Sequence, residues 1–158
     1  AVDGLANRYF DRCLEPRLFT GWGLRTLDSD AAAYNPLSYH NGSVWPHDTA
    51  IVAAAAARYG RTDVTRQIAE AAFETAAAFE NRPPELHAGF DRLDLPSPVP
   101  YPSSCSPQAW SSAAVLLHIR SLLNLHPGID GPRSGTDWEP LVELRGVRFR
   151  NRHFTIAP

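Results

Sequence analysis

Segment 35–48 gathers side chains that could bind a sugar. Within fourteen positions it holds two aromatic residues, two histidines, two asparagines, a glycine and an aspartate. Aromatic faces stack on the apolar faces of a pyranose ring, while amide, imidazole and carboxylate groups hydrogen-bond its hydroxyls. Its candidate binding residues are Tyr39, His40, Asn41, Trp45 and Asp48.

Three further segments carry candidates of the same kind. Trp22 lies between two glycines and Arg25 follows it closely, while a later segment, 105–110, contains Gln108 and Trp110. Segment 83–90 places Glu85 after two prolines, which stiffen the backbone that would aim a carboxylate.

Each candidate also has a purely structural reading. A tryptophan usually packs in a core, which we expect most for Trp110 on a buried helix face. His40 and Asn41 could bond loop backbone groups, and Asp48 could only complement a helix dipole.

The remaining candidates are equally open. The Arg25 guanidinium could donate hydrogen bonds to two sugar hydroxyls, or it could form an ion pair with Asp28. Gln108 could line the core, and Glu85 alone would be read as an exposed loop residue. His87 could tune Glu85 or merely be exposed.

Composition excludes several classes of protein. The 158 residues carry a net charge of -2, and the pI of 6.3 does not indicate a nucleic-acid or anionic-membrane partner. No apolar run approaches the ~20 residues of a membrane helix, and no signal peptide is evident. Cys13 and Cys105 lack zinc spacing, so we expect two reduced, buried thiols in a cytoplasmic protein, without cofactor or metal. The oligomeric state stays open.

The chain has the features of a piece of a longer gene product. All fifteen basic residues are arginine, methionine is absent, and the sequence opens in a helical pattern. We therefore expect a fragment.

Helical periodicity and end signals predict four helices, over residues 2–14, 46–59, 63–80 and 107–124. Pro46 suits a first turn, Gly60 a stop, and Thr62 an N-cap. Ser106 before Pro107 predicts the fourth start. The alanine-rich second helix reads as buried on all sides, and a short connection predicts that it packs antiparallel to the third.

The rest of the chain is irregular or extended. Residues 81–104 are too rich in proline for a helix or a central strand, and a loop this long is usually functional or disordered. Alternating apolar residues from Val142 to Ile156 predict short strands that turn near Asn151. We divide the chain into a helical domain, 1–128, and a loop and strand tail, 129–158.

Three ordered motifs then resemble one family. Residues 38–46, 84–86 and 106–110 are similar to motifs of the amylo-α-1,6-glucosidase, or glycogen-debranching, family, and residues 21–27 fit its bacterial members. The resemblance implies a mainly α fold, as part of an (α/α)6 toroid of helical hairpins.

The resemblance also implies a chemistry. Glu85 would be the general base of an inverting, exo-acting α-glucosidase acting on α-glucans or glucosyl oligosaccharides. The family's acid is an aspartate that nothing here matches, so we expect it on an absent N-terminal part and expect this chain alone to be inactive. Asp28, Asp30 and Asp48 are the local acidic alternatives. The alternative function is a non-catalytic carbohydrate-binding or interaction module.

Overall fold

The computed structural model describes residues 2–135 and 143–156. This part of the chain is mainly helical, with helices and two small antiparallel sheets. The helices are α1 (Val2–Cys13), α2 (Pro46–Arg58), α3 (Thr62–Ala78) and α4 (Ala109–Leu122). The strands are β1 (His126–Pro127), β2 (Pro132–Arg133), β3 (Leu144–Phe149) and β4 (Arg152–Ile156).

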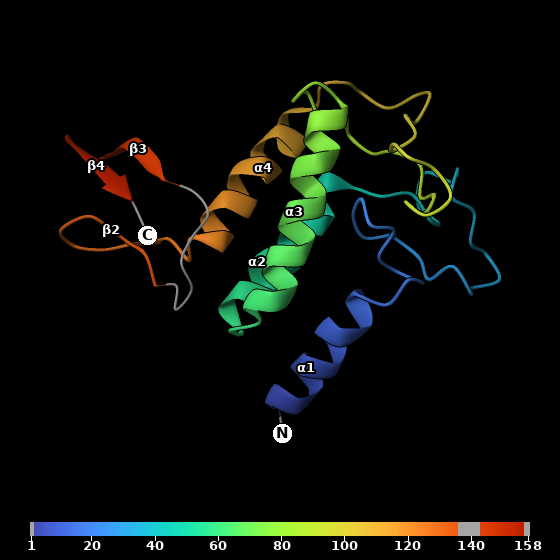
Figure 1. Cartoon of the computed structure of the whole chain (residues 1–158), viewed down its shortest axis with the longest axis horizontal. Helices are drawn as coiled ribbons and strands as arrows, with labels where there is room; N and C mark the ends of the chain where they lie inside the picture. The colour runs from blue at the N-terminus through green and yellow to red at the C-terminus, as the bar shows by residue number, and fades with distance from the viewer. Residues whose placement is uncertain (1, 136–142, 157–158) are drawn as a thin grey trace.

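Helices α2, α3 and α4 pack side by side, and α1 lies beneath them (Figure 1). The predicted antiparallel hairpin of α2 and α3 is confirmed. Small residues such as Ala53 and Ala56 are fully buried, which lets the helix axes approach closely. The core cluster contains Phe10, Cys13, Leu24, Ala53, Ala56, Val64 and Ile68.

Two details of α2 and α3 differ from the prediction. Helix α2 is not buried all round, because Ile51 and its C-cap, Tyr59, are about half exposed. Thr62 is not an N-cap but the first residue of α3, and Arg61 precedes it. The Arg61 guanidinium bonds the Asp63 carboxylate at 2.8 Å, so an ion pair stands where a hydroxyl cap was expected.

Helix α4 begins later and is more exposed than predicted. Gln108, not Ser106, is its N-cap, and its side-chain oxygen accepts a hydrogen bond from the Ala109 N–H. The later start follows because the Gln108 N–H donates to the Pro83 carbonyl and ties the chain to a loop. Leu116 is 68% exposed, so only one face of α4 is buried.

The tail confirms the predicted hairpin. Strands β3 and β4 pair antiparallel, with Phe149 opposite Arg152, so the turn includes Asn151. The β1–β2 pair was not predicted. Val142, part of the predicted alternation, lies outside the described residues. The division at residue 128 stays a prediction.

Four loop segments meet at one end of the helices. Single β-bridges pair Arg25 with Val44, Val44 with His87, and His87 with Pro100. We call these four residues the bridge ladder. Val44 and His87 exchange two backbone hydrogen bonds of 2.9 and 3.0 Å. The ladder brings segment 35–48 beside segment 83–90, and both segments lie on the same side of the helices in Figure 1.

Two glycines permit this approach. A Cβ on Gly89 would lie 1.7 Å from the Gly42 carbonyl oxygen, which no side chain can occupy. Gly42 has φ +146°, and a Cβ there would meet the Asn35 carbonyl at 2.7 Å. Glycine is therefore required at position 89 for the two loops to touch, and at position 42 for its own loop to pack against Asn35.

Candidate active site

Backbone hydrogen bonds to the start of α4 hold Glu85 in place. Its N–H donates to the Cys105 carbonyl at 2.8 Å, and the Ser111 hydroxyl lies 3.4 Å from its carbonyl oxygen. Two residues earlier, the Pro83 carbonyl accepts from the Gln108 N–H at 3.1 Å. Residues 105–111 thus fix the backbone of the candidate base.

The Glu85 carboxylate is held by Tyr39. The Tyr39 hydroxyl donates a 2.8 Å hydrogen bond to Oε1 of the partly buried Glu85. This bond is the main cause that raises the pKa of Tyr39 above its ordinary value. The phenol therefore stays a hydrogen-bond donor at neutral pH.

Tyr39 belongs to a group of six rings in mutual contact, which we call the aromatic cluster. The rings belong to Tyr39, His40, Trp45, His47, Tyr101 and Trp110.

Edge-on and stacked contacts link these rings. The Tyr39 centroid is 4.9 Å from that of Trp45 and 5.9 Å from that of Tyr101. Trp45 lies 6.0 Å from Trp110, which stacks on His47 at 4.9 Å. Such spacings are those of favourable aromatic pairs.

The aromatic cluster has a buried base and an exposed rim. Trp45 is only 8% exposed, and its indole N–H bonds the Tyr39 carbonyl and the Ser43 hydroxyl. Trp110 is 42% exposed, which corrects our expectation that it lies on a buried helix face. It sits in the first turn of α4, and its ring stacks on His47 in the first turn of α2.

Trp22 and Arg25 lie apart from the aromatic cluster. Trp22 is 6% exposed and is covered by the Arg92 guanidinium at 4.3 Å. Arg25 is buried, with hydrogen bonds to the Gly89 and Pro16 carbonyls. Its acidic partner is Asp91, at 3.5 Å, so the alternative in which Arg25 pairs with Asp28 is wrong.

The three other candidates differ in surroundings. Asn41 is exposed, and its backbone carbonyl accepts from Asn35 at 2.8 Å. The Gln108 side chain is used to cap α4. Asp48 lies 3.4 Å from His47 and also lines a hollow of about 210 Å³ beside Arg25, Tyr9 and Val52.

Asp28 and Asp30 are hydrogen-bonded to one another in a turn, and each forms an ion pair with an arginine. The Asp28 carboxylate accepts the Asp30 N–H at 2.9 Å and pairs with Arg12 at 3.0 Å, while Asp30 pairs with Arg17. The backbone hydrogen bond, followed by the two arginines, holds the pKa of Asp28 below its ordinary value. A general acid must be protonated before it acts, so this environment does not suit Asp28 for that role.

Two side chains near Glu85 rule out one expectation each: exposure of His87 and burial of Cys105. His87 is fully buried rather than exposed, because its backbone lies in the bridge ladder and turns the ring inward. Cys105 is exposed rather than buried, although Cys13 is buried and both thiols are free. Its carbonyl faces Glu85 while its side chain faces solvent.

Two members of the aromatic cluster were missed as candidates, namely His47 and Tyr101. His47 lies next to Asp48 in segment 35–48. Its stacking partner, Trp110, is 63 positions further along the chain, so the contact could not be predicted from the neighbouring sequence. Tyr101 sits in a proline-rich loop whose path the sequence does not reveal.

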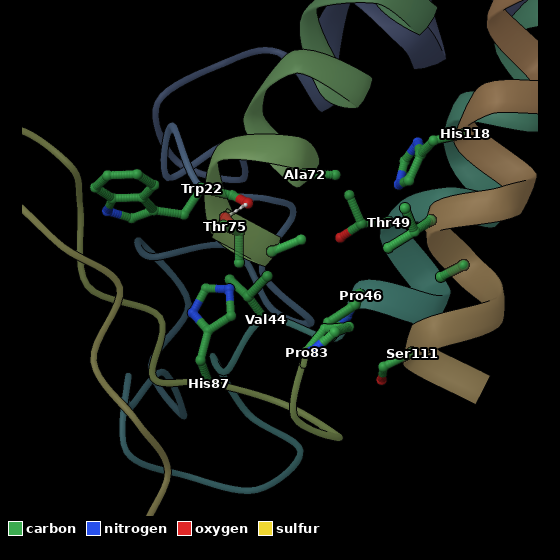
Figure 2. Close-up of a pocket in the computed structure, with 13 residues that line it drawn as sticks. Trp22, Val44, Pro46, Thr49, Ala72, Thr75, Pro83, His87, Ser111 and His118 are labelled. Carbon is green, nitrogen blue, oxygen red and sulfur yellow. Dashed lines mark hydrogen bonds between the residues drawn. The ribbon is translucent and has the colours of Figure 1, made fainter. Parts of the chain in front are cut away.

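A small cavity, with His87 and His118 in its wall, lies in the interior of the helical part of the chain (Figure 2). The cavity between α2, α3 and α4 measures about 20 Å³, far below the volume of small-molecule pockets. Across residues 2–135 and 143–156, no group of three or more His, Cys, Asp or Glu side chains could hold a metal. No helix there is long and apolar enough to cross a membrane.

The family model of the mannosylglycerate hydrolase MGH1-like glycoside hydrolase domain matches residues 4–87. The chain belongs to this family. The matched range contains Tyr39, Trp45 and Glu85, and ends before α4. Among curated proteins, none matches significantly.

Membership in the MGH1-like family confirms the relationship to glycoside hydrolases and to the six-hairpin glycosidase superfamily. It also implies a carbohydrate substrate in general terms.

Proposed function

We propose that this chain is part of an inverting, exo-acting glycosidase with Glu85 as general base. The observation that carries the proposal is the 2.8 Å hydrogen bond from Tyr39 to Glu85 inside the aromatic cluster. It places an oriented carboxylate beside rings on which a sugar can stack.

Inverting hydrolysis fits this arrangement. A base carboxylate activates water on one face of the sugar, while an acid some 6.5–9.5 Å away protonates the leaving oxygen on the other. Tyr39 occupies Oε1, and no described residue donates a hydrogen bond to Oε2. Oε2 would therefore accept the proton of the attacking water.

The general acid is proposed to lie outside these 158 residues. Asp28 and Asp30 are committed to ion pairs with arginines, and Asp48 is 60% exposed at the start of α2. On this proposal α1 to α4 form part of an (α/α)6 toroid in a cytoplasmic enzyme, and the acid comes from another of its hairpins.

The proposed substrates are α-glucans or glucosyl oligosaccharides, as for amylo-α-1,6-glucosidases. The exposed rim formed by Trp110 and His47 is open rather than enclosed, which suits the end of a longer chain. The matching family is described by a mannosylglycerate hydrolase, so short mannosyl glycosides are a further proposed class of substrate.

A second candidate is a non-catalytic carbohydrate-binding module. It is favoured by one observation. Among the described residues, Glu85 and the exposed Asp48 are the two carboxylates bonded to rings of the aromatic cluster, and Asp48 lies at a helix start rather than in the loops.

The deciding experiment is an assay of the full-length protein on α-glucans, glucosyl oligosaccharides and mannosylglycerate, following the anomer of the released sugar. Glu85→Gln should lower kcat by roughly 10²–10⁴-fold, the usual contribution of a general base. The control is Glu143→Gln, an exposed carboxylate in the tail.

Release of an inverted anomer that collapses only in Glu85→Gln supports the proposal. Unchanged turnover in Glu85→Gln removes Glu85 from the mechanism. Sugar binding without turnover of any substrate favours the binding module.

A further inference from the structure

A hollow of about 270 Å³ lies between the C-terminal ends of α2 and α4. The two helices run in the same direction, since His47 and Trp110 stack in their first turns while their last turns both line the hollow (Figure 1). The 13 residues of α2 span about 20 Å at the usual helical rise. A small ligand in the hollow therefore cannot touch the aromatic cluster.

Arginines dominate the charge of this hollow. Arg58 comes from the last turn of α2 and Arg120 from the last turn of α4. No Asp or Glu within residues 2–135 and 143–156 lines it. The other lining residues are small, apolar or uncharged polar, together with one histidine: Ala54, Ala57, Leu117, Ser121, Asn124, Leu125 and His126. We call this site the basic hollow.

Arginine in the last turn of a helix often serves only to complement the helix dipole. That role explains one arginine on each helix, but it does not require both to line the same hollow. Each helix end carries a partial charge of about −0.5, so two guanidinium groups leave the hollow positive by roughly one unit. On α3, by contrast, Arg66 is neutralised by Glu70 at 2.7 Å.

Hydrogen bonds hold the rim of the basic hollow. Arg120 Nε donates to the Leu125 carbonyl at 3.3 Å, so its terminal NH2 groups can still bind a ligand. His126 Nε2 lies 2.7 Å from Asn124 Oδ1, and the Asn124 amide donates to the Gly135 carbonyl at 3.1 Å. The segment that closes the hollow beyond α4 is therefore tied in place.

We propose that the basic hollow is a binding site for a small phosphate monoester. A guanidinium group binds an oxyanion through two parallel N–H donors, and one such pair satisfies the two oxygens of a carboxylate. A phosphate group offers three acceptor oxygens and nearly two negative charges, which matches two arginines better. Ala54, Ala57 and Leu117 give the ester body an apolar surface. The volume lies just below the 300–1,000 Å³ of drug-sized pockets, so the ligand is compact.

Calorimetric titration of the full-length protein with glycerol 3-phosphate, in low-salt buffer free of phosphate, tests the proposal. We expect saturable binding of glycerol 3-phosphate, weaker binding of lactate and none of glycerol. Arg58→Gln and Arg120→Gln should each weaken binding at least tenfold, because each removes charge-assisted hydrogen bonds. Arg66→Gln is the matched control, since it makes the same charge change on α3. Both arginines of the hollow are exposed, so circular dichroism should show unchanged helical content in their variants.

Three results would overturn the proposal: no saturable binding of glycerol 3-phosphate, equal binding of lactate, or equal binding by wild type and the variant that carries both Arg58→Gln and Arg120→Gln. Glu85→Gln and Trp110→Ala should leave the affinity as it is. A loss of binding in Trp110→Ala alone would assign the anion to the aromatic cluster instead. Because the basic hollow does not depend on Glu85, this proposal and the proposed function can fail separately.

Discussion

The aromatic cluster and the interior cavity contain the same types of side chain in opposite surroundings. In the aromatic cluster, the imidazole of His47 stacks on the half-exposed Trp110. In the cavity wall, His87 and His118 are buried, and several of their nitrogens lack partners within the described residues. The comparison teaches that access to solvent, not residue type, separates a surface suited to a sugar from a structural interior.

The largest expected effect is on stability in acid. Burial lowers the pKa of both His87 and His118 from 6.5 to about 4. Between these values the unfolded chain binds a proton at each histidine and the folded chain does not, so stability falls as pH falls. The slope should be about 1.4 kcal/mol per pH unit for each histidine.

Urea unfolding from pH 7 to pH 4 measures this slope. His118→Phe should remove about half of the histidine contribution, whereas Leu116→Ala, at an exposed position of the same helix, should leave the slope as it is. An equal slope in wild type and His118→Phe would contradict the assignment.

The next effect concerns the hydroxyl of Tyr39. Tyr39→Phe keeps the ring but removes the hydrogen bond to Glu85. A hydrogen bond to a charged group contributes about 1.5–3 kcal/mol. We therefore expect kcat to fall at least tenfold, with little change in KM.

Tyr101→Phe is the matched control, because its ring also contacts Tyr39. Equal kinetic losses in both variants would show that packing, rather than the hydrogen bond, is responsible.

The smallest effect is expected at the exposed rim of the aromatic cluster, and the buried base serves as its comparison. Trp110→Ala should raise KM several-fold, because a stacking contact contributes about 0.5–1.5 kcal/mol. Its stability should change by less than about 0.5 kcal/mol, since Trp110 is exposed. Trp45→Ala, at the buried base, should cost about 3–5 kcal/mol in unfolding free energy. Calorimetry and initial rates together separate the two, and a large stability loss in Trp110→Ala would contradict the description of the rim.

All helix ends were predictable to within two residues, because periodicity and a terminal proline or glycine act locally. Pro46 begins α2 as expected. Gln108 shows where local rules fail, since its N–H is taken by Pro83 from a loop 25 positions earlier. The start of α4 therefore depended on a partner distant in sequence.

The candidate site was predictable in composition but not in contacts. Segment 35–48 and Glu85 were identified from residue types and motifs, and the structure brings Tyr39 and Glu85 together. The orientations of His87 and Arg25 follow from the bridge ladder, whose pairings join residues up to 43 positions apart. Nothing in the neighbouring sequence encodes which face of an isolated bridge is buried.

The bridge ladder has a consequence for how activity responds to mild denaturation. Isolated bridges have few hydrogen bonds each and open more readily than helices, so such segments belong to the least stable units of a protein. The position of Glu85 depends on both loops remaining docked, through Val44 on one side and the start of α4 on the other. Catalytic competence would thus be lost at denaturant concentrations that leave the helical signal unchanged, which makes enzyme activity an earlier reporter of loop opening than circular dichroism.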